Sequence, residues 1–189
     1  LGNLGQTWSM PKVIKVRDGT TSGKVVLIFG GGYDVAEDLD SVGTKGRGVY
    51  VVDALTGTVL KRFLTTADGT NTISTSVPSD VTVVNVDRDA GGFSDRAYVG
   101  DLAGNVWRMD LDDPTSSTNA VAGWKLHKLA NLGARKFFYP PDVVLVVDAD
   151  CRLEPGSAAR LGAMVMALGR PVQARYDMQN PGALKRLVG

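Results

Sequence analysis

An acidic loop, NVDRDAGGFSD at residues 85–95, holds the side chains best suited to chemistry in this chain. Oxygen-bearing residues occupy alternate positions at its start, two glycines follow, and an aspartate closes it. Calcium takes about six to eight oxygen ligands, and carboxylates spaced by two in a tight loop can converge on it. We therefore expect a calcium site with the ligands Asn85, Asp87, Asp89 and Asp95. The alternative is a solvated turn, because Asp and Asn favour turns without a metal. The mutual repulsion of three carboxylates favours the metal.

Short strands must position this loop. Runs rich in Val, Tyr, Phe and Thr alternate with clusters of Gly, Asp, Asn and Ser, which is typical of strands and turns. The expected strands lie within residues 24–30, 48–54, 58–63, 80–86, 96–102 and 105–111. The acidic loop falls between the fourth and fifth of these runs. It is therefore not the helix–loop–helix of an EF-hand, and Arg96 stands where that motif has its last Glu.

An internal repeat indicates the architecture. VYVVDALTGTVLKRF starts at Val49 and AYVGDLAGNVWRMDL starts at Ala97, and both Tyr50/Tyr98 and Asp53/Asp101 are 48 residues apart. A hairpin that recurs at about 40–50 residues suits propeller blades of four antiparallel strands. Residues 1–141 are therefore expected to form a partial β-propeller of about three blades. The repeated Asp, and the Gly that follows it, are expected to shape turns.

The amino-acid sequences of these segments resemble those of a known family. The segments GQTWSMPKV, VVLIFGGGYD, GVYVVDALTG, DRAYVGDLAGNVWRMDL and RKFFYPPDVVL are similar to the C-terminal propeller of PilC/PilY-type pilus biogenesis factors and tip adhesins. The resemblance implies a non-catalytic protein of the bacterial cell surface, with type IV pilus components or a host or surface receptor as partners. It also implies calcium at a D-x-D-x-D-G-x-x-D loop. Asn85, Asp87, Asp89 and Asp95 match those ligand positions, with two extra residues before Asp95.

Residues 142–189 follow a different pattern. DVVLVVDAD is a nearly continuous apolar run, typical of a strand buried on both faces, and an amphipathic helical stripe follows within residues 157–168. We expect a short β-α-β-α fragment. It resembles family-two (GT-A) glycosyltransferases, which implies a vestigial Mg²⁺ or Mn²⁺ and donor motif at Asp148 and Asp150. Most of that catalytic domain is missing, so we expect no turnover and interpret the chain as a fusion of unrelated fragments.

Composition excludes several function classes. The 189 residues contain 21 Lys+Arg and 20 Asp+Glu, for a net charge of +1, which gives no electrostatic case for nucleic acid. No apolar run approaches the roughly 20 residues of a membrane span, and the first residues lack the features of a signal peptide. Cys151 is interpreted as a packed thiol and His127 as an ordinary strand or loop residue.

Three further features are interpreted as structural or weak. The acidic segment YDVAEDLD, with Asp34, Glu37, Asp38 and Asp40, is expected to be a solvated loop. The triplet Gly30–Gly32 is expected to be a blade turn, since no helix follows to bind phosphate. GVYVVDALTG is also similar to quinone-dependent dehydrogenase propellers, although no set of cofactor ligands is visible. The competing hypotheses are thus a pilus module, a glycosyltransferase fragment and a quinoprotein-like propeller.

Overall fold

The structure is a computed structural model that describes residues 2–39, 43–86, 91–112, 121–133 and 135–142. Strands dominate the described part, and its helical segments are two short 3₁₀ turns, η1 (Val35–Leu39) and η2 (Val121–Gly123). The prediction of a mainly β protein is therefore confirmed for these residues. The predicted β-α-β-α tail lies outside them.

The first four strands form one antiparallel sheet, here called the first blade. They are β1 (Lys12–Val16), β2 (Lys24–Gly30), β3 (Val49–Asp53) and β4 (Val59–Phe63), and their order in the sheet is the order in the chain. Side chains alternate between its two faces, as the two-residue period of a strand requires. Val26, Ile28 and Val51 point to one face and are fully buried.

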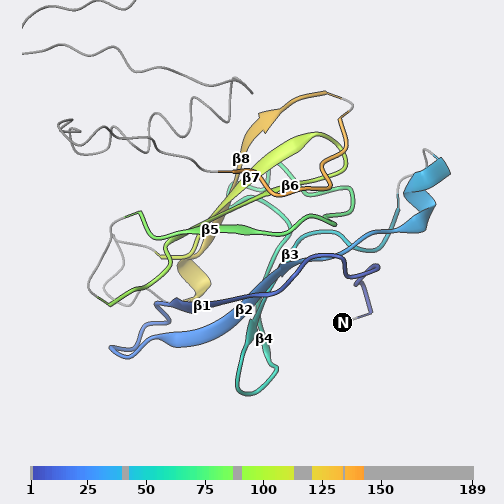
Figure 1. Cartoon of the computed structure of the whole chain (residues 1–189). Coiled ribbons are helices and arrows are strands. Elements are labelled where there is room, and N and C mark those ends of the chain that lie inside the picture. Colours follow the sequence, from blue (N-terminus) through green and yellow to red (C-terminus); the bar gives the residue numbers. More distant parts are fainter. Residues whose placement is uncertain (1, 40–42, 87–90, 113–120, 134, 143–189) are drawn as a thin grey trace, which may run out of the picture.

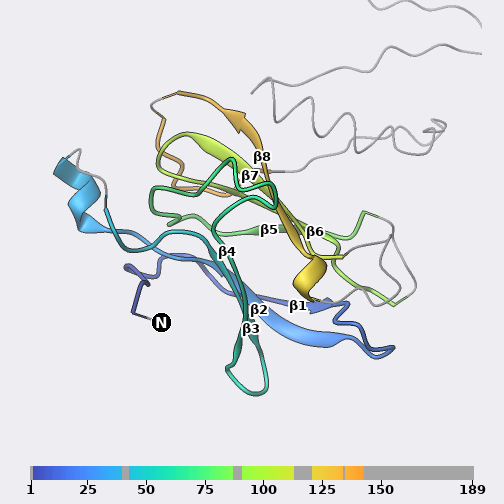
Figure 2. The same cartoon turned by 180° about the vertical axis from the view of Figure 1, so that it is seen from behind.

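The last four strands repeat this arrangement as the second blade. They are β5 (Thr82–Val84), β6 (Arg96–Gly100), β7 (Asn105–Asp110) and β8 (Lys125–Asn131), again in sequential antiparallel order. Such a four-stranded meander is the form expected of a propeller blade. Figures 1 and 2 both show the second blade stacked over the first.

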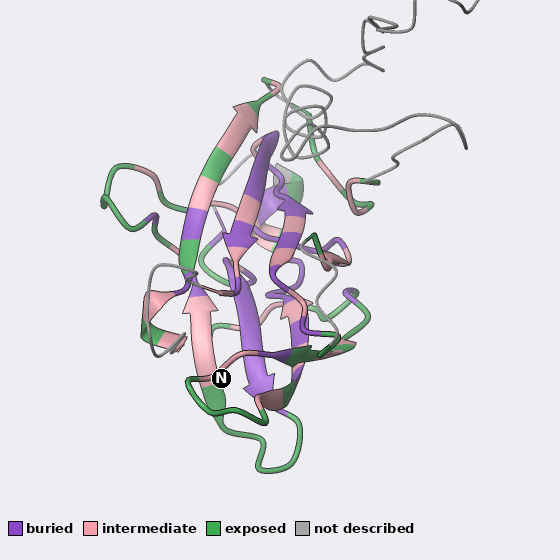
Figure 3. Cartoon of the chain, turned by 90° about the vertical axis from the view of Figure 1, so that its left-hand side faces the viewer, coloured by how far each residue is buried: buried purple, intermediate pink, exposed green. Residues whose placement is uncertain are grey.

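The two blades share one hydrophobic core. Phe63 and Val51 of the first blade belong to the same buried cluster as Trp107, Met109 and Leu126 of the second. Figure 3 shows buried residues concentrated on the central strands of the molecule, with exposed residues at the loops and edges. Burial of a large apolar side chain contributes about 1.5–3 kcal/mol, so this shared cluster is the main force holding the blades together.

The expectation of about three blades was wrong for the described residues, which form two. The prediction assumed one blade per 48 residues and did not allow for residues that lie between and outside the sheets. Residues 64–81, between the blades, contribute only isolated bridges such as Gly32↔Val77 and Arg47↔Ser76. Likewise, the described residues before Lys12 contribute one isolated bridge, Gln6↔Tyr33.

The first blade leaves an apolar outer face. Val13 pairs with Leu27 on the face opposite the shared core, and Val13 and Val25 are 69% and 45% exposed. Val59 is also exposed and pairs with Val52 on the same face. Exposed apolar surface of this kind favours association. We expect the isolated chain to associate through this face.

Replacing Val13 and Val25 by lysine should reduce this self-association, because like charges repel across the associating faces. The measurement is light scattering during size-exclusion chromatography over a range of protein concentrations. Val35→Lys is the matched control, since Val35 is exposed on η1, outside the sheet face. Unchanged association in the double variant, or an equal decrease in the control, would contradict the assignment.

Candidate calcium loop and its supports

The base of the acidic loop joins the end of β5 to the start of β6. Asn85 is partly buried immediately after β5, and Asp95 is buried immediately before β6. Of the four predicted ligands, the structure therefore places these two at opposite ends of one loop. Asp87 and Asp89 lie outside the described residues.

Asp95 ties the two ends of the loop together. Its Oδ1 accepts a hydrogen bond from the backbone N–H of Val86 (2.9 Å), and its own N–H donates to the carbonyl of Val84 (3.3 Å). Its carbonyl accepts from the N–H of Leu111 (2.9 Å), the first residue after β7. These bonds fix the carboxylate within the loop base, as a metal ligand requires.

Phe93 docks the loop onto the first blade. Its ring is buried, with Lys15 Nζ and Arg17 Cζ each 4.5 Å from the ring centroid, and the N–H of the next residue, Ser94, donates to the carbonyl of Lys15 (2.8 Å). A Cβ at Gly23 would lie 2.3 Å from a Phe93 ring carbon, so the β1–β2 turn requires glycine there. The loop therefore links the two blades. The sequence offered no signal for this contact.

Arg96, the residue after Asp95, is held by two ion pairs. Its Nε lies 3.3 Å from Asp110 Oδ1 and its Nη1 lies 3.0 Å from Asp112 Oδ1. Burial lowers the pKa of Arg96, but the neighbouring charges of Asp110 and Asp112 more than offset this and raise it above its usual value. This pairing stabilises the start of β6, next to the loop. The loop lies between strands β5 and β6, unlike the loop of a helix–loop–helix EF-hand.

The donor chemistry of the loop fits calcium. One amide oxygen and three carboxylates form an all-oxygen set, which suits a hard divalent cation. Within residues 2–39, 43–86, 91–112, 121–133 and 135–142, no three His, Cys, Asp or Glu side chains are grouped as a metal site. The calcium site therefore stays a prediction that depends on Asp87 and Asp89.

The acidic segment after β2 is not the solvated loop that the sequence suggested. Asp34 and Glu37 are only 9% and 5% exposed, whereas Asp38 is exposed and Asp40 lies outside the described residues. Glu37 Oε1 accepts from the N–H (2.9 Å) and the hydroxyl (3.0 Å) of Ser76, which belongs to the connection between the blades. The segment is buried because this distant stretch of chain covers it.

Asp34 completes this buried polar contact. Its Oδ2 accepts from the N–H of Thr44 (2.8 Å) and Lys45 (2.9 Å), and its own N–H donates to the Ser76 hydroxyl (3.0 Å). The amide of Lys45 contributes most to lowering the pKa of Asp34 below its usual value. These carboxylates accept hydrogen bonds from distant parts of the chain, so they support the fold.

The other structural predictions are confirmed. Asp53 accepts from the N–H of Leu55 (2.9 Å) and Thr56 (3.0 Å), and Asp101 accepts from the N–H of Ala103 (2.9 Å), so both repeated aspartates shape turns. Gly57 and Gly104 have positive φ angles of 72° and 77° in these turns. His127 lies on β8, with Nε2 3.1 Å from Asp110 Oδ2.

The glycine triplet also behaves as a turn. Gly30 ends β2, and Gly32 has a positive φ of 100°. A Cβ at Gly31 would lie 2.4 Å from the carbonyl oxygen of Gly46, so close backbone packing explains the glycine. The segment that follows is a 3₁₀ turn and not the helix that a phosphate site needs.

Two further sequence predictions concern the tail and membrane spans. Asp148, Asp150 and Cys151 lie outside the described residues, so the glycosyltransferase-like motif stays a prediction. Among the described residues, no helix is both long and apolar enough to cross a membrane.

Comparison with known proteins identifies relatives of the described part. A family model described as the PilY1 beta-propeller domain matches residues 2–132. The type IV pilus biogenesis factor PilY1 of Pseudomonas aeruginosa strain UCBPP-PA14 is 29% identical over 123 residues, which cover 62% of this chain and 9% of that protein. Its counterpart in strain PAO1 is 29% identical over 125 residues, with the same coverage. The chain thus spans less than a tenth of the length of these relatives.

One solved structure is also similar. The crystal structure of the Pseudomonas aeruginosa PilY1 C-terminal domain aligns with a TM-score of 0.45 and 23% sequence identity. The alignment covers 78% of this chain and 27% of that chain.

Proposed function

This chain belongs to the PilY1 beta-propeller domain family, and from that membership we propose that it is a non-catalytic, calcium-binding propeller segment of a type IV pilus assembly or adhesion protein. The observation that carries the proposal is the family match over residues 2–132, which includes both blades and the acidic loop. The proposed location is the bacterial cell surface. The proposed partners are other pilus components or a host or surface receptor.

The loop gives the proposed calcium a mechanical role. Bound calcium would neutralise the carboxylates and hold the end of β5 against the start of β6. Asp95 already fixes the base by accepting from Val86, and Phe93 carries the loop onto β1. Asn85, Asp87, Asp89 and Asp95 would hold the ion. The site would thereby stabilise the contact between the blades.

The family match favours the pilus hypothesis over the two alternatives. The described residues contain no feature that specifically favours a quinoprotein-like cofactor site. The glycosyltransferase hypothesis rests on residues 142–189, beyond the end of the family match at residue 132.

A chimaera tests the proposed pilus function. The matching segment of the Pseudomonas aeruginosa relative is replaced by residues 2–132 of this chain, in a strain that lacks its own copy. Pilin is then sheared from the cell surface and measured. We expect surface pilin to be restored relative to the deletion strain, because the segment supplies the same two blades.

A second chimaera with Asp101→Ala is the matched control, since this change removes a buried turn anchor. It should lose both protease resistance and surface pilin. A first chimaera that is present at the wild-type level and resists protease, yet restores no pilin, would contradict the proposed function.

A further inference from the structure

An elongated groove runs between β4 of the first blade and β8 of the second. It consists of two adjoining cavities of about 310 and 230 Å³, which share Ala67 and Leu126 in their linings. Among the described strands, both are the last in their sheets, so each presents a sheet edge. The groove lies between two consecutive blades.

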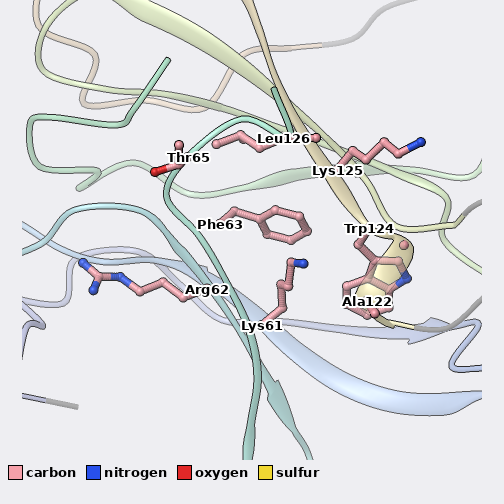
Figure 4. Close-up of a pocket in the computed structure, with 10 residues that line it drawn as sticks. Lys61, Arg62, Phe63, Thr65, Ala122, Trp124, Lys125 and Leu126 are labelled. Atoms are coloured by element: carbon pink, nitrogen blue, oxygen red, sulfur yellow. The ribbon is translucent and has the colours of Figure 1, made fainter. Parts of the chain in front are cut away.

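An aromatic wall forms the rigid side of the first cavity. Phe63 and Trp124 stack with ring centroids 6.4 Å apart and an interplanar angle of 12°, and both rings are buried. Figure 4 shows these two side chains with Lys61, whose Nζ lies 5.9 Å from the Phe63 ring centroid. The groove is thus pre-formed, with a cation beside its aromatic wall.

Lysines without carboxylate partners lie along the groove. Lys61 pairs in register with Val51, and Lys128 with Trp107, so both lysines are on the faces that the two blades turn toward each other. Lys128 Nζ is 5.8 Å from the Trp107 ring centroid. Within the described part of the chain, neither lysine forms an ion pair. The inter-blade lining therefore carries positive charge that the described part of the chain does not neutralise.

Other charged residues in the lining are turned away or occupied. In Figure 4, Arg62 and Lys125 extend away from the two rings, and the Arg62 guanidinium donates to the carbonyl of Arg47 (2.9 Å). Asp68 accepts from the Thr66 hydroxyl, which is the main reason that its pKa falls to about 2, and from the N–H of Thr70 (3.0 Å). Asp68 stays ionised, but it is the one carboxylate in the two linings against four cations (Lys61, Arg62, Lys125 and Lys128), so a ligand meets a net positive charge.

We propose that this groove binds an extended acidic peptide segment along β8, with its carboxylates paired to Lys61 and Lys128. Charge complementarity selects an acidic ligand, and the elongated shape beside an open strand edge selects an extended peptide over a compact molecule. Side chains of an extended strand alternate between its two faces, so carboxylates at every second position can face both lysines, while the apolar side chains between them point away from the lining. The proposal is independent of the calcium loop, which lies between β5 and β6.

Fluorescence anisotropy with a labelled peptide of alternating Glu and Val tests this proposal on the full chain. The matched control peptide has Gln in place of every Glu, so that both peptides bring the same apolar side chains. We expect the acidic peptide to bind at least about tenfold more tightly, and its affinity to fall as salt is added. Equal binding of the two peptides would overturn the proposal.

Variants locate the site. Lys61→Gln with Lys128→Gln should weaken binding of the acidic peptide about tenfold or more, whereas Lys12→Gln, on the edge strand β1, should leave it unchanged. Melting temperatures of the variants report whether the fold is kept. If the double variant and the Lys12→Gln control weakened binding equally, the assignment to this groove would be overturned. Free glutamate that competes as strongly as the peptide would show a small-anion site and overturn the peptide proposal.

Discussion

Replacing Asp101 by alanine should lower the free energy of unfolding by about 3–5 kcal/mol, as expected when a buried, multiply bonded carboxylate is removed. Asp101 is fully buried, and its Oδ1 accepts from the N–H of Ala103 (2.9 Å) and of Asn105 (2.9 Å). Its Oδ2 accepts from Asn105 Nδ2 (2.8 Å) and from Trp107 Nε1 (2.8 Å). Alanine removes the carboxylate acceptor of the Asn105 N–H, Asn105 Nδ2 and Trp107 Nε1, whereas the Ala103 N–H keeps the Thr75 hydroxyl as an acceptor (3.0 Å).

Asp53→Ala is the matched control, because Asp53 occupies the equivalent position 48 residues earlier. Its side-chain partner is Lys24 Nζ (2.8 Å), and the Lys24 side chain is 35% exposed. Water can solvate this ammonium group after the substitution, so the loss of stability should be smaller than for Asp101. Chemical denaturation of both variants measures the difference. An equal or larger loss for Asp53→Ala would contradict the account of these turns.

The stability that Asp53 contributes should depend on pH. The hydrogen bond from Lys24, followed by the amides of Leu55 and Thr56, lowers the pKa of Asp53 to about 2 from an ordinary value of 3.8. Because the folded-state pKa is depressed, the stabilisation is fully present above the ordinary value and is lost as the pH falls toward 2. The difference between wild type and Asp53→Ala should therefore shrink in this interval.

The central strands and the edge strands β4 and β5 were predictable from sequence, whereas the edge strands β1 and β8 were not. β2, β3, β6 and β7 coincide with the expected runs because they are rich in Val, Ile, Tyr and Trp. β1 (KVIKV) and β8 (KLHKLAN) carry lysines and stand at sheet edges, where lysine limits pairing with other chains. The same lysines weakened the strand pattern, so both strands were missed.

Contacts between distant segments account for the other differences. The sequence showed acidic side chains at Asp34 and Glu37, but it did not show that Ser76 would lie against them. Similarly, the repeat predicted the turns at Asp53 and Asp101, while the docking of Phe93 beside Lys15 depends on how the blades pack. Local patterns thus predicted turns and six of the eight described strands, whereas burial of polar groups followed from tertiary packing.

For the candidate site, the sequence predicted the ligand set and the loop. The structure adds the hydrogen bond that fixes Asp95 and the ion pairs that hold Arg96 at the start of β6. Lys15 and Arg17 near the Phe93 ring place positive charge beside the loop, which would lower the calcium affinity of the proposed site. Asp87 and Asp89 must then contribute most of the attraction for the cation.

Calcium-dependent unfolding of the full chain tests the proposed site most directly. Melting is followed in chelator, in calcium and in magnesium, for the wild type, for Asp87→Ala with Asp89→Ala, and for Asp18→Ala as a control carboxylate outside the loop. Calcium should stabilise the wild type by about 2.7 kcal/mol at a hundredfold excess over Kd, and magnesium should do less because it demands a tighter octahedral shell. The double variant should lose this effect and Asp18→Ala should keep it. A melting temperature that does not respond to millimolar calcium in folded wild-type protein, or a shift that persists in the double variant, would contradict the calcium site.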